Sequence, residues 1–212
     1  MVRKVSSNGS IMSTVGDGEN TVYGLAQCRG DIFNNSKGCS ECVMTAAQKL
    51  QADCVKAASG KIWYDFCSIR FDSNNFFGKA DVSITKTYRN VKTADDQEAF
   101  HDTVWQLLEW VKMSAATKSN RFGIGKINFA SQNLTIYGMA QCTEDLSGLA
   151  CIGCLTQMSS SLKQGCPYQI GCVAVTGSCR LRYEASNFIL TAEVPLFPAD
   201  QHTAPAPAPL PN

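Results

Sequence analysis

Eleven cysteines dominate this chain of 212 residues, and they fall into two clusters that repeat each other. The segment Thr-Val-Tyr-Gly-Leu-Ala-Gln that leads to Cys28 matches the segment Thr-Ile-Tyr-Gly-Met-Ala-Gln that leads to Cys142. Self-similarity at a fixed offset is the signature of duplicated structure. After a two-residue insertion in the first copy, four further pairs align at an offset of 112 residues: Cys39, Cys42, Cys54 and Cys67 with Cys151, Cys154, Cys166 and Cys179. The sequence therefore predicts two tandem copies of one domain.

The odd number of cysteines follows from a single mismatch between the copies. Cys172 in the second copy aligns with Gly60 in the first, so the copies hold six and five cysteines. Residues other than cysteine keep the same offset, namely Arg70, Phe71, Asp72 and Phe76, which align with Arg182, Tyr183, Glu184 and Phe188.

Three kinds of chemistry use cysteines at such spacings: disulfides, zinc and thiol redox. Cys39-Ser-Glu-Cys42 and Cys151-Ile-Gly-Cys154 are CxxC pairs, which zinc sites and redox sites both use. A zinc site normally adds a second CxxC or a histidine pair nearby, and neither is present in the sequence around these pairs. A redox pair would leave three further cysteines per copy unexplained. The spacing favours a disulfide framework without metal or cofactor, and hence an oxidising compartment outside the cytoplasm.

Charge and motif content argue against several classes of function. The net charge is +1 and the basic residues form no run, so nucleic acid is not an expected partner. No apolar run is long enough to cross a bilayer. The only two histidines are His101 and His202, and no nucleophile–base pair, phosphate loop or paired-carboxylate motif stands out. We therefore expect a protein that binds rather than an enzyme.

The N-terminus lacks the signal peptide that a secreted protein needs. Polar residues follow Met1-Val-Arg-Lys where an apolar segment would be expected. Either a precursor segment is absent from this chain or its gene model begins inside the first domain. Much more sequence of structured character precedes Cys142 than Cys28, which favours the second explanation and predicts a first domain truncated at its N-terminus.

Apolar periodicity predicts an α+β fold for each copy, an antiparallel sheet of about five strands with two helices packed on it. In the second copy a helix is expected at 95–112 and a hairpin at 121–130 and 134–141, with its turn at 131–133. A helix follows each CxxC pair, and short strands close each copy; the expected ranges are 40–58 and 152–163 for the helices, and 62–71 and 173–183 for the strands.

The predicted domains are 1–79 and 80–194, followed by a Pro/Ala-rich tail at 195–212. The tail holds six of the seven prolines and is expected to be solvated or extended as polyproline II. Three sequons allow N-glycosylation in a secreted protein, at Asn8, Asn34 and Asn133. Asn133 is the best placed because it lies in the predicted hairpin turn.

These residues resemble a known plant family. The spacing C-x8-C-x2-C of Cys142, Cys151 and Cys154 is similar to the signature of the ginkbilobin-homologous domain, also called the stress-antifungal domain or domain of unknown function 26. The closing Ser-Cys179-Arg-Leu-Arg-Tyr-Glu184 strengthens the match, whereas the first copy departs from it with ten residues between Cys28 and Cys39. The resemblance covers roughly residues 10–190. Tandem copies occur in cysteine-rich repeat secretory proteins, plasmodesmata-located proteins and the ectodomains of cysteine-rich receptor-like kinases.

The resemblance implies a disulfide pattern. The family's third bond joins the cysteine of the second helix to an N-terminal cysteine that neither copy retains. We therefore expect Cys172 to substitute locally in the second copy, and the first copy to keep one free thiol because its partner lies upstream of Met1. The expected pairs are Cys28–Cys39, Cys42–Cys67, Cys142–Cys151, Cys154–Cys179 and Cys166–Cys172, with Cys54 free.

The resemblance also implies function by extracellular binding in defence or stress. The founding ginkbilobin is an antifungal protein that binds mannose through an Asn, an Arg and a Glu. Of this set the second copy retains Glu184, with Val173 at the Arg position, while the first copy holds Lys61 and Asp72. The expected partners are glycans such as mannose, or extracellular or microbial proteins. The alternatives are an interaction module from a receptor-like kinase or plasmodesmal ectodomain, and a thiol-redox sensor that uses the CxxC pairs.

Overall fold

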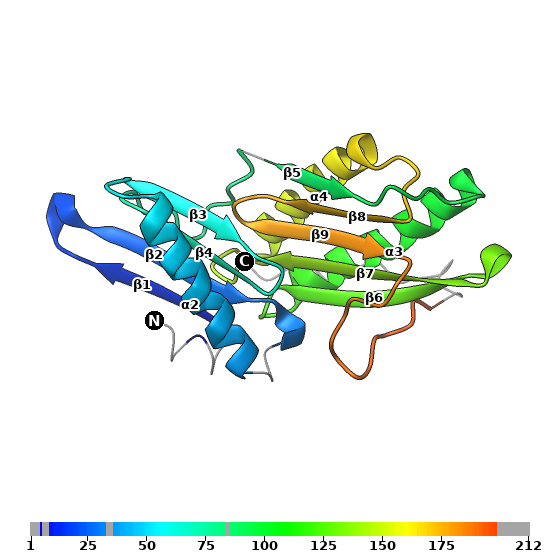
Figure 1. The fold of residues 1–212 in the computed structure, drawn as a ribbon, viewed down its shortest axis with the longest axis horizontal. Coiled ribbons are helices and arrows are strands. Elements are labelled where there is room, and N and C mark those ends of the chain that lie inside the picture. The colour runs from blue at the N-terminus through cyan, green and yellow to red at the C-terminus, as the bar shows by residue number, and fades with distance from the viewer. Residues whose placement is uncertain (1–4, 6–8, 33–35, 84, 199–212) are drawn as a thin grey trace. The chain divides into compact units, whose positions relative to one another are not determined.

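The chain folds into two compact units, Met1–Lys79 and Ala80–Asn212, in a computed structural model. The structure describes all residues except 1–4, 6–8, 33–35, 84 and 199–212. Each unit has its own antiparallel sheet, covered by α2 in unit 1 and by α3 and α4 in unit 2, which is the expected α+β class (Figure 1).

In the described part of unit 1, four strands lie in the order β1-β2-β4-β3, and α2 packs on the sheet (Figure 1). Two short 3-10 turns, η1 and η2, flank β2. The bounds are β1 Ser10–Val15, η1 Gly18–Asn20, β2 Val22–Cys28, η2 Gly30–Ile32, α2 Ser36–Asp53, β3 Ser59–Trp63 and β4 Cys67–Asp72.

The residues that the structure describes in unit 2 form five strands in the order β5-β8-β9-β7-β6. The helices α3 and α4 contact each other and lie side by side on one face of the sheet (Figure 1). The bounds are β5 Lys86–Arg89, α3 Gln97–Thr117, β6 Phe122–Phe129, η3 Ala130–Gln132, β7 Leu134–Cys142, α4 Gly148–Gly165, β8 Gly171–Val175 and β9 Cys179–Glu184.

The two sheets share one register, as a duplication requires. Cys28 pairs with Cys67 across β2 and β4, and Cys142 pairs with Cys179 across β7 and β9. The order β1-β2-β4-β3 therefore matches β6-β7-β9-β8 strand for strand. Among the described residues, unit 1 has no counterpart of β5. Val5, which is helical and buried, precedes β1 as α3 precedes β6 in unit 2.

Side-chain caps and an apolar stripe fix the two helices of unit 2. Asp96 caps α3 by accepting a hydrogen bond from Ala99 N at 3.3 Å, and Ser147 caps α4 by accepting one from Ala150 N at 3.1 Å. The buried stripe of α3 recurs at helical spacing through Phe100, Val104, Leu107, Leu108 and Val111. The helix runs past the expected end at residue 112 because its next turn is also buried, at Ala115 and Ala116.

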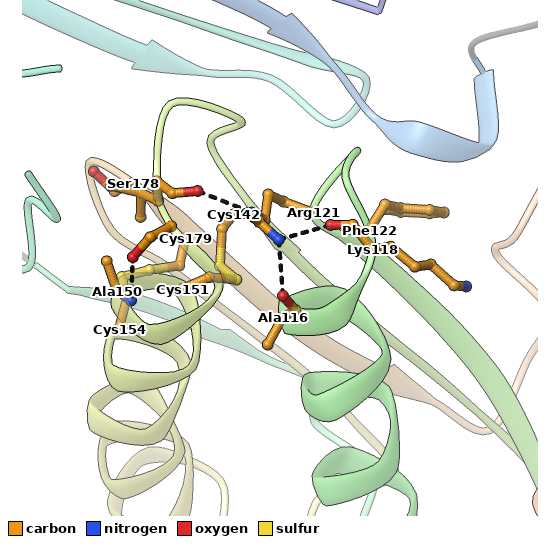
Figure 2. The surroundings of a disulfide bond; sticks show 12 residues. Ala116, Lys118, Arg121, Phe122, Cys142, Ala150, Cys151, Cys154, Ser178 and Cys179 are labelled. Atoms are coloured by element: carbon orange, nitrogen blue, oxygen red, sulfur yellow. Dashed lines mark hydrogen bonds between the residues drawn. A yellow bond between two sulfur atoms is a disulfide. The ribbon is translucent and has the colours of Figure 1, made fainter. Parts of the chain in front are cut away.

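Five disulfides tie the helices to the sheets, and they are the five pairs expected from the sequence. Their Cα–Cα separations of 5.7–6.4 Å lie in the range that disulfides require. In unit 2, Cys142–Cys151 and Cys154–Cys179 join the first turns of α4 to β7 and β9 (Figure 2). Cys54 remains a free thiol.

A single arginine closes the turn from α3 to β6. Arg121 adopts a φ of 49°, and its guanidinium Nη1 donates hydrogen bonds to the carbonyls of Ala116 at 2.8 Å and Lys118 at 2.9 Å (Figure 2). Its Nε donates to Leu146 O at 2.9 Å. The charge thus satisfies the carbonyls that are left without a partner at the end of a helix.

The structure departs from the expected elements in several places. The helix expected at 40–58 is α2, which ends at Asp53. Each closing segment, 62–71 and 173–183, forms two strands joined by a turn. About five strands were expected in a complete copy, but no range was predicted for the short strands β1 and β5. The tail also begins later than residue 195, because Lys126 N donates to Pro195 O at 2.8 Å and Phe197 N donates to Lys126 O at 2.7 Å.

Candidate functional site

The residues expected to contact a sugar in unit 1 lie on one face of neighbouring strands. Lys61 on β3 is directly opposite Arg70 on β4, and Asp72 follows Arg70 by two residues. Side chains alternate between the two faces of a strand, so all three share one face. The Lys61 side chain is exposed, while those of Arg70 and Asp72 keep 17% and 21% of their surface exposed.

A cation stacked on an aromatic ring anchors this group. The guanidinium carbon of Arg70 lies 4.0 Å from the ring centroid of Phe76, and its Nη2 lies 3.9 Å from Asp72 Oδ2. The Asn74 backbone N–H donates to Asp72 Oδ1 at 2.9 Å. The carboxylate of Asp72 is therefore held between a cation and a turn, with part of its surface left to solvent.

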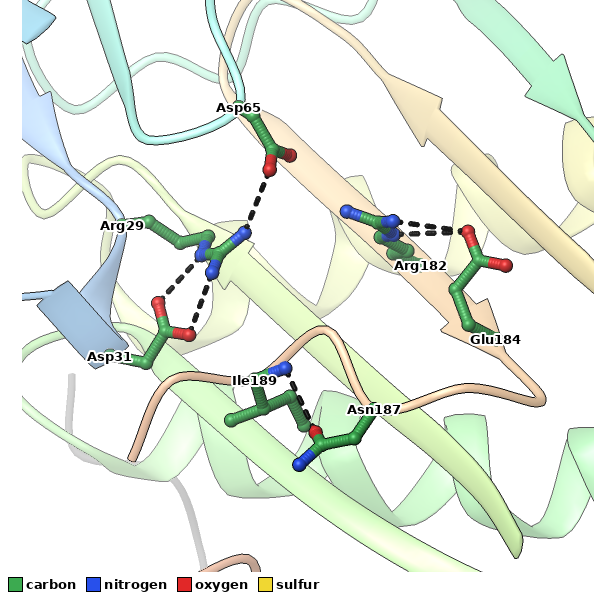
Figure 3. A network of polar contacts seen from close by, with 7 residues as sticks. All are labelled: Arg29, Asp31, Asp65, Arg182, Glu184, Asn187 and Ile189. Atoms are coloured by element: carbon green, nitrogen blue, oxygen red, sulfur yellow. Dashed lines mark hydrogen bonds and ion pairs between the residues drawn. The ribbon is translucent and has the colours of Figure 1, made fainter. Parts of the chain in front are cut away.

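Unit 2 repeats this cluster with a closer ion pair. Arg182 lies with its guanidinium 4.1 Å from the Phe188 ring centroid, and its Nη2 donates to Glu184 Oε1 at 3.1 Å (Figure 3). The Glu184 carboxylate fills the space above Gly171, where any side chain would overlap it. Val173 lies opposite Arg182, at the place that Lys61 takes in unit 1.

The sequence did not single out Arg70 and Arg182 as members of these clusters. Both belong to a pattern of an arginine, an acid two residues later and a phenylalanine six residues after the arginine, and the pattern recurs between the copies. Residues i and i+2 of a strand share one face, so this repeated pattern could have predicted that the arginine lies beside the acid.

A second charged group lies in unit 1, around Arg29. Its guanidinium forms a bidentate pair with Asp31, with Nε to Oδ1 at 2.6 Å and Nη2 to Oδ2 at 2.8 Å, and both side chains are buried (Figure 3). Its Nη1 lies 3.2 Å from the half-exposed carboxylate of Asp65. The buried pair of Arg29 and Asp31 stabilises the segment that follows β2, because each charge satisfies the other inside the protein.

The CxxC pairs are structural rather than redox-active. Cys39 bonds to Cys28, and Cys42 bonds to Cys67. Cys151 and Cys154 likewise bond to cysteines of the sheet. The two cysteines of each CxxC therefore have different partners, which contradicts the redox-sensor alternative.

The three sequons differ in what the structure says about them. Asn133 is exposed in the turn before β7 and adopts the left-handed conformation, with a φ of 48°. Asn8 and Asn34 lie outside the described residues.

Comparison with known proteins assigns the chain to a family. The family described as salt stress response/antifungal matches residues 1–74 and 86–186. The chain belongs to this family. In the stress-antifungal family, cysteine-rich repeat secretory protein 38 of Arabidopsis thaliana is 37% identical over 89% of this chain and 74% of that protein. The antimicrobial ginkbilobin-2-like protein of Castanea crenata is 34% identical over 88% of this chain and 76% of that protein.

Two solved structures from Arabidopsis thaliana share the tandem arrangement. The tandem DUF26 ectodomain of the cysteine-rich receptor-like protein PDLP8 matches with a TM-score of 0.75 at 24% identity, over 88% of this chain and 85% of that chain. That of PDLP5 matches with a TM-score of 0.68 at 27% identity, over 88% and 86%. Like cysteine-rich repeat secretory protein 38, the chain is a secreted, extracellular protein. Disulfides staple both of its domains. Among the residues that the structure describes, every helix is too short or too polar to cross a membrane.

Proposed function

We propose that the protein acts in plant defence or stress response as a non-enzymatic binding protein of the extracellular space. The description of its family and the printed name of its chestnut relative, an antimicrobial protein, support this assignment. The disulfides that join α2 and α4 to their sheets support it further, because a rigid scaffold positions a binding surface.

Within that role, we propose that unit 1 binds a carbohydrate such as mannose at Lys61, Arg70 and Asp72. The carrying observation is the shared face of these three side chains, with a cation at each of two positions and a partly exposed carboxylate beside them. Sugar hydroxyls donate to carboxylates and accept from cations, so the set matches the chemistry of a sugar ring. Unit 2 is the weaker candidate because Val173 replaces the lysine and Glu184 is already paired with Arg182.

Calorimetric titration with mannose, together with a glycan array, tests this site. We expect heat of binding at millimolar sugar for the wild type and its loss in Lys61→Ala. The matched control is Lys86→Ala, which removes an exposed strand lysine from unit 2 and leaves the proposed site intact. Absence of heat from the wild type at millimolar mannose would end the carbohydrate hypothesis. Equal loss in both variants would show that Lys61 has no specific role.

The second candidate is an extracellular protein-interaction module. The likeness to two receptor-like ectodomains favours it, as does cysteine-rich receptor-like protein kinase 25, which is 32% identical over 89% of this chain but only 28% of that protein. A full-length transcript separates the two candidates. A membrane span or kinase encoded downstream supports the interaction module, and an early stop supports the secretory defence protein.

A further inference from the structure

Among the described residues, the sheets of the two units end in four edge strands, and three of these carry charged residues. The edges are β1 and β3 in unit 1, and β5 and β6 in unit 2. Lys61 lies in β3, and Lys86 and Arg89 lie in β5, while Lys126 lies in β6. Charged side chains on an edge strand oppose the addition of a further strand, which an open edge otherwise invites. Strand β1, with the sequence Ser-Ile-Met-Ser-Thr-Val, has no charged residue.

The strand of unit 2 that matches β1 is also covered along its edge. On β6, Lys126 N donates to Pro195 O at 2.8 Å, and Phe197 N donates to Lys126 O at 2.7 Å. The ladder register gives the place of Lys126 to Thr14 in unit 1. Within the part of the chain that the structure describes, β2 is the one strand that pairs with β1. This edge of unit 1 therefore has neither the charge nor the pairing segment that its counterpart has.

The edge of β1 presents backbone groups at alternate residues (Figure 1). Gly9 O accepts a hydrogen bond from Cys28 N at 2.7 Å, so the backbone groups of Gly9 point towards β2. In an antiparallel pair this direction alternates from one residue to the next. The N–H and C=O groups of Met12 and Thr14 therefore point away from β2, to the side where a further strand would pair.

The side chain of Met12 leaves apolar surface open beside these backbone groups. Met12 takes the place of Ile124 in unit 2, which packs with Ile189 from the segment that follows β9. Ile124 is 9% exposed, whereas Met12 is 50% exposed. A strand that pairs with β1 would satisfy the backbone groups and cover this apolar surface at the same time.

We propose that β1 pairs with β1 of a second copy of this chain, in antiparallel fashion around a two-fold axis at Met12. The residues that face the open edge are Ser10, Met12 and Thr14, and their polar, apolar, polar order is the same in both directions. Around this axis the two Met12 side chains lie opposite each other, and each Ser10 lies opposite the partner's Thr14. Methionines bury each other there and hydroxyls meet hydroxyls, which are favourable cross-strand pairs.

Charge selects this partner strand among the edges that a second copy offers. Strands β3, β5 and β6 would each bring at least one cation against the apolar edge of β1, whereas a second β1 brings none. A two-fold pair also closes on itself, because both copies use the same surface. The pairing does not use β3 or β4, so it is independent of the sugar site proposed at Lys61, Arg70 and Asp72.

Sedimentation velocity of the intact chain tests the proposal, at up to about 1 mM protein because one pair of short strands forms a small interface. The parent protein and all variants carry Cys54→Ser, since oxidation of the free thiol would also give dimers. Met12→Lys sets two like charges against each other at the axis, and Met12→Glu does the same with the opposite sign. Met44→Lys is the matched control, because this methionine of α2 is 48% exposed and lies away from the edge.

We expect the parent and Met44→Lys to dimerise equally, and each Met12 variant alone to dimerise at least roughly tenfold more weakly, because like charges then meet. An equimolar mixture of Met12→Lys and Met12→Glu should recover the association, since opposite charges then meet at the axis. Hydrogen exchange at the amides of Met12 and Thr14 should slow in the parent as the protein concentration rises.

Three outcomes would overturn the proposal. A parent that stays monomeric over this concentration range would leave the edge to a strand of a different protein. Dimers that survive Met12→Lys, or that Met44→Lys weakens to the same degree, would place the contact elsewhere on the chain. A mixture of the two Met12 variants that fails to associate would exclude the two-fold axis at this residue.

Discussion

The side chain of Cys54 lies over the backbone of Gly60, so that a Cβ built on Gly60 would be 3.2 Å from the Cys54 sulfur. The same two positions hold the Cys166–Cys172 disulfide in unit 2. Unit 1 therefore lacks the local partner that Cys172 provides in unit 2.

Gly60→Cys is expected to form a sixth disulfide with Cys54. The Cβ would meet the Phe71 ring at 2.6 Å, but unit 2 accommodates Cys172 beside the equivalent Tyr183, so the ring can move. Closing this short loop should stabilise unit 1 by about 2 kcal/mol, less the cost of moving the ring. Thiol titration of the denatured protein should fall from one thiol to none.

Gly60→Ala is the matched control for this variant. It adds the Cβ without a sulfur, so we expect one thiol to remain and the unfolding free energy to fall by about 1–3 kcal/mol. Two free thiols in Gly60→Cys would contradict the match between the two positions.

Removing one charge of the buried pair of Arg29 and Asp31 should destabilise unit 1 much more than removing both. Arg29→Met leaves the Asp31 carboxylate buried without its bidentate partner, which should destabilise unit 1 by about 3–5 kcal/mol. The double variant Arg29→Met/Asp31→Leu removes both charges and should recover most of the loss. Denaturant unfolding, followed with a probe specific to unit 1, measures both. A double variant less stable than Arg29→Met would show that the pair itself stabilises the fold.

Tyr183 predicts a loss of stability at alkaline pH. Burial, and to a lesser degree the nearby charge of Glu184, raise the pKa of its phenol well above the ordinary value of 10.0. The folded state therefore holds this proton more tightly than the unfolded state. Its contribution to the free energy of unfolding is complete below about pH 10. The contribution is lost as the pH rises further, because the phenol ionises in the unfolded state but not in the folded state.

Tyr183→Phe tests whether this phenol causes the alkaline loss of stability. The substitution should be tolerated, because unit 1 already has Phe71 at the same position. The variant loses the hydrogen bond from the phenol to Gln169 O, about 1 kcal/mol at neutral pH, but its stability should fall less steeply above pH 10. Urea midpoints between pH 8 and pH 11 measure the slope, in a Cys54→Ser background that prevents thiol exchange. Parallel slopes for the two proteins would assign the alkaline loss to other groups.

Duplication explains why much of this fold could be predicted from the sequence. The offset between Cys142 and Cys28 carries the strand register and the helix after each CxxC from one copy to the other. Amphipathic periodicity located α3, because Phe100, Val104 and Leu107 all point to one core. What the pattern could not supply were short edge strands such as β5, whose sequence Lys-Thr-Tyr-Arg lacks a buried alternation.

Pairing between segments far apart in the chain could not be predicted from the sequence either. Composition assigned residues from Pro195 onward to a solvated tail, yet β6 is an edge strand whose Lys126 has backbone groups free to pair with Pro195 and Phe197. The Phe197 ring then meets Trp110 edge-on at 5.6 Å. The ion pair of Glu184 with Arg182 was not predicted either, because the family resemblance assigns this carboxylate to a sugar rather than to a neighbour on its strand.

Asn133 is expected to carry an N-glycan when the protein passes through a plant secretory pathway. It lies exposed in a hairpin turn at a φ of 48°, a conformation that asparagine tolerates, so oligosaccharide addition meets no buried surface. Thr135→Val removes the sequon while keeping Asn133 in its turn, and costs only a 3.4 Å hydrogen bond to Asn128. Mass spectrometry of the peptide that contains Asn133 should show a glycan in the wild type and none in Thr135→Val. An unmodified peptide from the wild type would contradict the assignment.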